Sequence, residues 1–243
     1  MVKNILFEVC CGGIEDVVAA VNCKADRIEL NSALELGGLT PSVSLLREVK
    51  QLTDIPVCCM VRPRGSGFCY SDKEYALIKK EAEMLLNNGA DGIVFGFLKE
   101  DGFIDARRTK EFVSLIKPKE AVFHKAFDHV KDKDEAIKTL IDCGVDRILT
   151  SGTLTMSDDG LEIMKHLNET YGHKISILPG GGVNKDNIVT ILKTTGCHQI
   201  HMTGKMLKAD FSTYHGNEND DYRYYAVSED NLMELMKITD SAF

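Results

Sequence analysis

No stretch of this 243-residue sequence is long and apolar enough to cross a bilayer. Residues 1–4 carry no charged leader, long apolar segment or small-residue cleavage site ahead of the first apolar run. The chain also lacks a basic stripe, and its formal net charge of −8 disfavours a nucleic-acid-binding surface. These absences lead us to expect a cytoplasmic protein with neither a membrane nor a nucleic acid as its partner.

Proline is scarce, with five residues, and no stretch rich in proline, glycine and serine marks an internal linker. A chain of this length with 44% hydrophobic residues can bury one large core. We therefore expect residues 1–243 to form a single domain. Eight cysteines are present, but without a secretory signal or a Cys-x-x-Cys motif we interpret them as reduced thiols.

One short phrase, running from a helix end into a strand, recurs near residues 24–28, 89–93, 144–148 and 196–200. The copies are 65, 55 and 52 residues apart, so each interval has room for a second strand and helix. Short apolar runs suited to the intervening strands lie at residues 5–10, 56–61, 121–124 and 175–178. Eight alternating strands and helices in about 250 residues predict an α/β fold, the closed (β/α)8 or TIM barrel.

The segment of residues 205–230 breaks this rhythm. Its middle, from Tyr214 to Tyr222, is too polar for a core helix, and an amphipathic pattern resumes at Asn231. We predict a long polar loop before the last helix. Such a loop is either a lid over the barrel mouth or a poorly ordered segment.

Side chains inside such a barrel, near the carboxyl ends of its strands, form the active site. Alternation along the first strand directs Phe7 and Val9 toward the helices, and the same rule applies to the other strands. The polar and thiol side chains left inside are Glu8, Cys10, Arg27, Glu29, Asn31, Arg62, Arg64, His124, Asp128, Gln199, His201 and Thr203.

This polar interior has two interpretations. Arg27 and Arg147 lie near strand starts, where we expect them to neutralise buried carboxylates as structural ion pairs. Nearer the carboxyl ends, two carboxylates beside a cation and a histidine are suited to proton transfer, because their pKa values are driven apart. We predict five catalytic residues: Glu8, Glu29, Arg62, His124 and Asp128. Glu8 or Glu29 would be the acid/base, but the residues do not define a reaction. The alternative is that the same groups clamp a small polar ligand.

Glycine runs after the predicted seventh and eighth strands indicate an anion site, because many barrels bind phosphate there through backbone amides. The residues that we expect to contact the anion are Arg64, Ser151, Gly180, Gly181, Gly182, Thr203 and Gly204. The alternative is that the glycines only form tight turns into helices, with Asn184 or Ser42 as N-caps. The expected partner is a small anionic or phosphorylated metabolite.

Several motifs, in this order, resemble the CutC family: Phe7-Glu8-Val9-Cys10, Ala25-Asp26-Arg27-Ile28-Glu29-Leu30, Gly37-Gly38-Leu39-Thr40-Pro41-Ser42, Arg62-Pro63-Arg64-Gly65, Phe123-His124-Lys125-Ala126-Phe127-Asp128 and Leu149-Thr150-Ser151-Gly152. The resemblance extends from Phe7 to about Gly204. It implies a cytosolic (β/α)8 barrel that is described as a copper homeostasis protein and forms homo-oligomers, such as a dimer or tetramer.

In that family, copper binding is attributed to cysteines after the first and second strands. Cys10 matches the first position, whereas Asn31 occupies the second. Lys125 also replaces the family's arginine, which keeps the charge and loses the bidentate fork. The alternative function is therefore Cu(I) binding, with copper held by Cys10 and thiols that lie near it in the sequence or on the third strand: Cys11, Cys58, Cys59 and Cys69.

Overall fold

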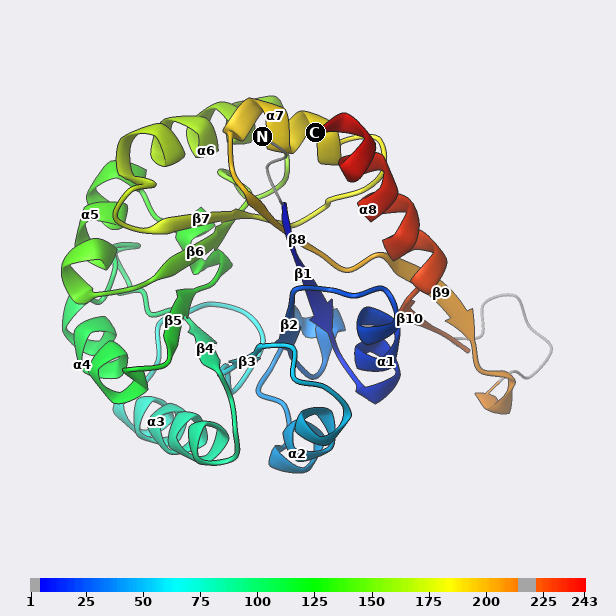
Figure 1. Cartoon of the computed structure of the whole chain (residues 1–243). Coiled ribbons are helices and arrows are strands. Elements are labelled where there is room, and N and C mark those ends of the chain that lie inside the picture. Colours follow the sequence, from blue (N-terminus) through cyan, green and yellow to red (C-terminus); the bar gives the residue numbers. More distant parts are fainter. Residues whose placement is uncertain (1–4, 214–221) are drawn as a thin grey trace.

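Eight parallel strands and the helices around them form a nearly closed barrel (Figure 1), which confirms the predicted (β/α)8 architecture. The computed structural model describes residues 5–213 and 222–243. The barrel strands are β1 (Leu6–Cys11), β2 (Arg27–Leu30), β3 (Val57–Met60), β4 (Gly92–Phe95), β5 (Glu120–Phe123), β6 (Arg147–Thr150), β7 (Ser176–Pro179) and β8 (Gln199–Met202). The helices are α1 (Ile14–Asn22), α2 (Val43–Leu52), α3 (Asp72–Asn87), α4 (Ala106–Ile116), α5 (Lys133–Cys143), α6 (Asp158–Tyr171), α7 (Ile188–Thr195) and α8 (Glu229–Ala242).

The strand order is β7-β6-β5-β4-β3-β2-β1-β8, so the first strand pairs with both the second and the eighth. β7 and β8, the two ends of this order, are connected by a side chain: Nε2 of Gln199 on β8 donates to the carbonyl of Ile177 on β7 at 3.1 Å. Among the helices of residues 5–213 and 222–243, none is long and apolar enough to cross a membrane.

The aspartate of the recurring phrase explains why the phrase recurs. Asp26 lies just before β2, and its carboxylate accepts the backbone N–H of Phe7 on β1. The two later aspartates make the same bond to the preceding strand of the barrel, so each fixes where two neighbouring strands start together. The three pairs are Phe7–Asp26 at 2.8 Å, Val57–Asp91 at 3.0 Å and Ala121–Asp146 at 2.8 Å.

Alternation along the strands separates two kinds of interior, as predicted. The outward-facing residues of β1 and β2 belong to the large apolar core between barrel and helices: Phe7, Val9, Ile28 and Leu30. The inward-facing residues of the same strands are buried but polar: Glu8, Arg27 and Glu29. A small apolar cluster of Cys58, Met60, Val94 and Val122 fills the other side of the barrel lumen.

The predicted loop at residues 205–230 is wrong in part. Lys205–Ala209 (β9) and Arg223–Val227 (β10) pair as an antiparallel hairpin that projects from the barrel beside α1 (Figure 1). Aromatic and β-branched residues in β10 favour a strand, and a hairpin on the surface needs no core-like composition. At its base, the N–H of Val227 donates to Asp16 on α1 at 2.8 Å. The most polar part, residues 214–221, lies outside the described residues.

Candidate metal centre at the barrel mouth

A cavity of about 980 Å³ opens at the carboxyl ends of the barrel strands. Its wall is formed by residues on or after β1, β2, β3, β5, β6, β7 and β8, together with α8 and the base of the hairpin. Seven of the predicted site residues line it: Cys10, Glu29, Arg62, His124, Gly182, Thr203 and Gly204. The other predicted residues do not: Glu8, Arg64, Asp128, Ser151, Gly180 and Gly181.

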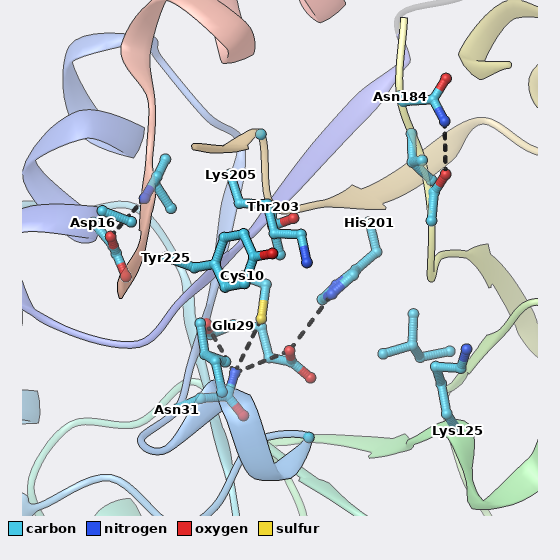
Figure 2. Close-up of a pocket in the computed structure, with 18 of the residues that line it drawn as sticks. Cys10, Asp16, Glu29, Asn31, Lys125, Asn184, His201, Thr203, Lys205 and Tyr225 are labelled. Atoms are coloured by element: carbon cyan, nitrogen blue, oxygen red, sulfur yellow. Dashed lines mark hydrogen bonds and ion pairs between the residues drawn. The ribbon is translucent and has the colours of Figure 1, made fainter. Parts of the chain in front are cut away.

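Three potential metal ligands from three adjacent strands converge in this cavity. Cys10 on β1 is the register partner of Glu29 on β2, and His201 comes from β8 on the other side of β1. The donor atoms of the three side chains all lie within 4.8 Å of one another, and all three residues are buried. Figure 2 shows the thiol, the carboxylate and the imidazole facing one another. This group could hold a metal ion.

Asn31 borders this cluster and supplies hydrogen bonds to it, where a cysteine would have supplied a metal-binding thiolate. Its Nδ2 donates to Glu29 Oε2 at 3.0 Å and lies 3.4 Å from the Cys10 sulfur. The amide therefore orients one oxygen of Glu29, while the other, Oε1, has no hydrogen-bond partner in the described structure. A buried carboxylate oxygen without a partner is unfavourable unless a ligand or an ion satisfies it.

Burial and neighbouring charges set the protonation of this cluster. Burial, and next the charge of Glu29, hold the pKa of the Cys10 thiol well above its usual value. Burial alone would lower the pKa of His201, but the carboxylates of Glu29 and Glu8 raise it. Cys10 is therefore a neutral thiol at neutral pH, and a metal ion would have to displace its proton.

Glu8 lies below the cavity in a network of buried ion pairs. Its Oε2 accepts from Arg27 and lies 3.6 Å from Arg147, and its Oε1 lies 2.8 Å from His201 Nδ1. The structural role expected of both arginines is thus confirmed for Glu8, whereas Glu29 pairs with neither of them in the described structure. Both oxygens of Glu8 bind protein groups, and Glu8 does not line the cavity.

The donors of Arg62, predicted as a catalytic residue, and of Arg64, predicted to contact the anion, bind groups of the protein itself. Arg62 donates through Nη1 to the carbonyls of residues 36–38, at 3.0–3.2 Å, and through Nη2 to Ser66 at 2.6 Å. Arg64 pairs with Glu74 at 2.6 Å and lies over the Tyr70 ring, outside the cavity. Arg62 therefore holds the loop after β2 in place, and only its Nε is without a partner in the described residues.

His124 and Asp128 point in different directions, because the strand geometry does not persist beyond β5. A 3-10 helix (Lys125–His129) begins after His124, whose Nδ1 accepts the N–H of Ala126 at 3.1 Å. Asp128 turns toward β6, where it accepts from Thr150 and from the Ser151 hydroxyl at 2.9 Å. His124 faces the cavity, whereas Asp128 is buried behind it.

The glycine run after β7 is shaped by close approaches. A Cβ at Gly180 would lie 2.6 Å from Leu149 and 2.9 Å from His201, and one at Gly181 would lie 2.4 Å from the Lys125 amine. Gly181 and Gly182 also have positive φ angles, of 90° and 88°. Elsewhere the turn interpretation holds for Ser42, which caps α2 by accepting the N–H of Leu45.

The other thiols do not surround Cys10. Cys11 and Cys59 belong to the core outside the barrel, Cys58 packs in the lumen beside Val122, and Cys69 is exposed. A copper site made of Cys10 and these thiols is therefore not what the structure forms; the neighbours of Cys10 are an imidazole and a carboxylate.

Two residues of the cavity that the proposals below use, His201 and Lys125, were not among the predicted site residues. His201 had been placed on the inner wall by alternation along its strand, which gives its face, whereas its proximity to Cys10 and Glu29 depends on the register between strands. Lys125 was noticed only as a departure from a motif, because nothing in the sequence shows that its amine reaches Ser151, 2.8 Å away and directly after the next strand, β6.

The comparisons with known proteins agree with this architecture. Residues 5–206 match the model of the CutC family. A CutC family protein of Treponema denticola is 44% identical over 211 residues, which span 87% of this chain and 86% of that protein. The human copper homeostasis protein cutC homolog is 42% identical over 203 residues, which span 84% of this chain and 74% of that protein.

Solved structures give the same result. A copper homeostasis protein CutC from Streptococcus agalactiae superposes with a TM-score of 0.77 at 30% identity, covering 81% of this chain and 97% of that one. Thiamine phosphate pyrophosphorylase from Pyrococcus furiosus, at 19% identity and a TM-score of 0.60, covers 100% of this chain and 98% of its own, and shares the fold alone. The family match, the relatives above 40% identity and the shared barrel together establish that this chain belongs to the CutC family.

Proposed function

We propose that the protein binds copper at the barrel mouth through Cys10, Glu29 and His201, and that it acts in copper homeostasis. The observation that carries this proposal is the convergence of a thiol, a carboxylate and an imidazole within 4.8 Å. The human and Streptococcus agalactiae relatives, which share the family, are both named copper homeostasis proteins.

The spacing of the donors suits a metal ion. The 3.7 Å between His201 Nε2 and Glu29 Oε2 is within a few tenths of an ångström of the edge of a tetrahedron around a small metal, which is roughly 3.4 Å for nitrogen and oxygen donors bound at about 2.1 Å. Thiolate suits Cu(I) and zinc, and imidazole suits copper and zinc, so this donor set suits copper, with zinc as the competing ion. The unpartnered Glu29 Oε1 supplies a further oxygen.

The side chains of this chain would prepare the site before a metal arrives. Asn31 holds Glu29 by one oxygen, which leaves the other free for an ion. Glu8 holds Nδ1 of His201, so the opposite nitrogen faces the cavity. A bound metal ion would supply positive charge to keep Cys10 as a thiolate, in spite of its burial.

Anaerobic titration with Cu(I) against a competing chelator tests the proposal. We expect one site for each chain, and we expect Cys10→Ser and His201→Gln each to weaken it at least tenfold, an estimate from the loss of one of three ligands. Cys197→Ser is the matched control, because Cys197 is buried outside the cavity. Equal affinity of the Cys10 and Cys197 variants would refute the proposal. Zn(II), titrated in parallel, would reveal whether the site prefers copper.

A second candidate is the binding of a small anionic or phosphorylated molecule in the same cavity, as the glycine run led us to propose. The specific observation that favours it is the amine of Lys125, a cationic group on the cavity wall, beside the glycine turn after β7. A cation next to flexible backbone is suited to an anionic group. Calorimetric titration with inorganic phosphate tests this candidate.

We also propose that the protein works in the cytoplasm. All eight cysteines are free, and seven of them are buried. Buried thiols without a disulfide are typical of reducing compartments. Fractionation of cells followed by immunoblotting tests the location.

A further inference from the structure

The cavity has two unlike sides. The ligands of the proposed metal lie on β8, β1 and β2, whereas Lys125 and the glycine turn follow β5 and β7. Figure 2 shows the Lys125 amine across the cavity from Cys10 and Glu29, with His201 between them. The polar groups around Lys125 are therefore not accounted for by the proposed metal site.

His124 on this far side presents a hydrogen-bond donor that has no acceptor. Its Nδ1 accepts from the backbone of Ala126, so the proton of the neutral ring is on Nε2. The residue is only 4% exposed, and this buried nitrogen has no hydrogen-bond partner in the described structure. Burial, and next the charge of Arg62, lower the pKa of His124 to about 3, so the ring stays neutral. A buried N–H without an acceptor is unfavourable, and a ligand that accepts from it would offset this cost.

Phe68 fixes the ring in this position. Its centroid lies 4.9 Å from that of His124, and Arg62 covers the other part of Phe68 at 5.1 Å. A Cβ at Gly96 would lie 2.4 Å from the ring, so a larger residue at this position would displace the ring. The imidazole packs against Phe68 and Gly96, and Nε2 is the one polar atom that it can offer to a ligand.

Lys125 adds a positive charge with one hydrogen to spare. Its amine donates to Ser151 at 2.8 Å and lies 3.3 Å from Asp128, which together use two of its three N–H bonds. Its side chain is 36% exposed and lines the cavity. The absence of a side chain at Gly181 lets the amine reach the turn after β7, where Gly182 and Val183 also line the cavity.

We propose that this side of the cavity is a subsite for the carboxylate or phosphate group of a small organic anion, with Lys125 and the His124 Nε2–H as its donors. The inference rests on the second candidate function and names the residues that would bind the anionic group. The rest of the ligand would extend toward Cys10, Glu29 and His201, and only this part depends on the proposed metal. A volume of about 980 Å³ leaves room for such a molecule next to an ion.

Calorimetric titration with two probes, inorganic phosphate and malonate, tests the subsite. We expect one or both to bind, and Lys125→Gln to weaken the stronger one by roughly tenfold or more, because a charge-assisted hydrogen bond is lost. Lys174→Gln is the matched control, since Lys174 is exposed and outside the cavity. The preference between the two probes distinguishes a phosphate from a carboxylate ligand. Equal affinities of the two lysine variants, or no binding of either probe, would overturn the subsite.

A second measurement separates this inference from the metal site. Cys10→Ser should keep its affinity for the probe in the absence of metal, because the subsite lies on the other wall. If Cys10→Ser loses the probe and Lys125→Gln keeps it, the anion binds at the metal ligands and the subsite is refuted, while the metal proposal stands. The NMR signals of the His124 ring supply a readout that does not depend on Lys125, and they should shift when the probe binds.

Discussion

Nδ1 of His201 lies 2.8 Å from Oε1 of Glu8, its register partner on the neighbouring strand β1. Burial alone would raise the pKa of Glu8, but the hydrogen bond from His201 and the charge of Arg147 hold it far below its usual value. An ionised carboxylate only accepts, so His201 donates through Nδ1 and turns Nε2 toward Glu29. Carboxylates commonly orient metal-binding imidazoles in this way.

Glu8→Gln should therefore affect both stability and metal binding. The substitution removes a buried negative charge that faces Arg27 and Arg147, which should reduce the free energy of unfolding by about 3 kcal/mol. Looser control of the His201 ring should weaken metal binding by roughly tenfold. Urea unfolding and chelator competition measure the two effects.

The control for this variant is Glu15→Gln, because Glu15 is exposed on α1. It removes the same charge from the chain and should leave both quantities unchanged. If Glu8→Gln behaves like Glu15→Gln, the buried network is not a source of stability.

Asn31→Cys should strengthen Cu(I) binding. The Asn31 amide lies 3.4 Å from the Cys10 sulfur, so a thiol at this position would face Cys10. Two thiolates suit Cu(I) better than one, and we expect the affinity to rise by roughly tenfold or more. Chelator competition measures it, with Ser114→Cys on the exposed face of α4 as the control for an added thiol. An unchanged affinity in Asn31→Cys would show that Cys10 does not contact the metal.

The barrel and the direction of its strand residues were predictable because both depend on local periodicity. The recurring phrase revealed four strands, and alternation placed Cys10, Glu29 and His201 on the inside. Alternation gives the face of a residue and not its depth, so Glu8 was expected at the mouth and lies one layer lower, against Arg27. Depth depends on the register between strands, which no single strand encodes.

Residues beyond the strand ends were harder to predict. Asp128 was assigned to the same face as His124 on the assumption that the strand continued, and the 3-10 helix after β5 turns it away. Arg62 was expected to face a ligand, but the loop that folds over it presents three consecutive carbonyls to its guanidinium. Such directions are set by tertiary contacts, which a one-dimensional pattern does not contain.

Arg62→Lys should loosen the loop after β2. An ammonium cannot replace the fork that reaches the carbonyls of residues 36–38 and of Ser66, and carbonyls left without a donor should cost about 1–3 kcal/mol. Faster hydrogen exchange in the loop and a lower melting temperature are the expected observations. Arg64→Lys is the matched control, since that side chain is 41% exposed and should tolerate the change. Equal effects of the two variants would contradict the role given to Arg62.

His124 should make the protein sensitive to mild acid. Its pKa is lowered from 6.5 to about 3 in the folded protein, first by burial and then by the charge of Arg62. Between these two values the unfolded chain binds a proton that the folded protein excludes, so stability falls as the pH falls through this window. The contribution of one such group reaches about 1.4 kcal/mol for each pH unit. Urea unfolding at several pH values from 4 to 6.5 measures the slope.

His124→Gln cannot take up the proton, and its stability should therefore depend less steeply on pH than that of the unmodified protein. His173→Gln, which changes an exposed histidine, should keep the original slope, and equal slopes in both variants would show that His124 is not held neutral by burial.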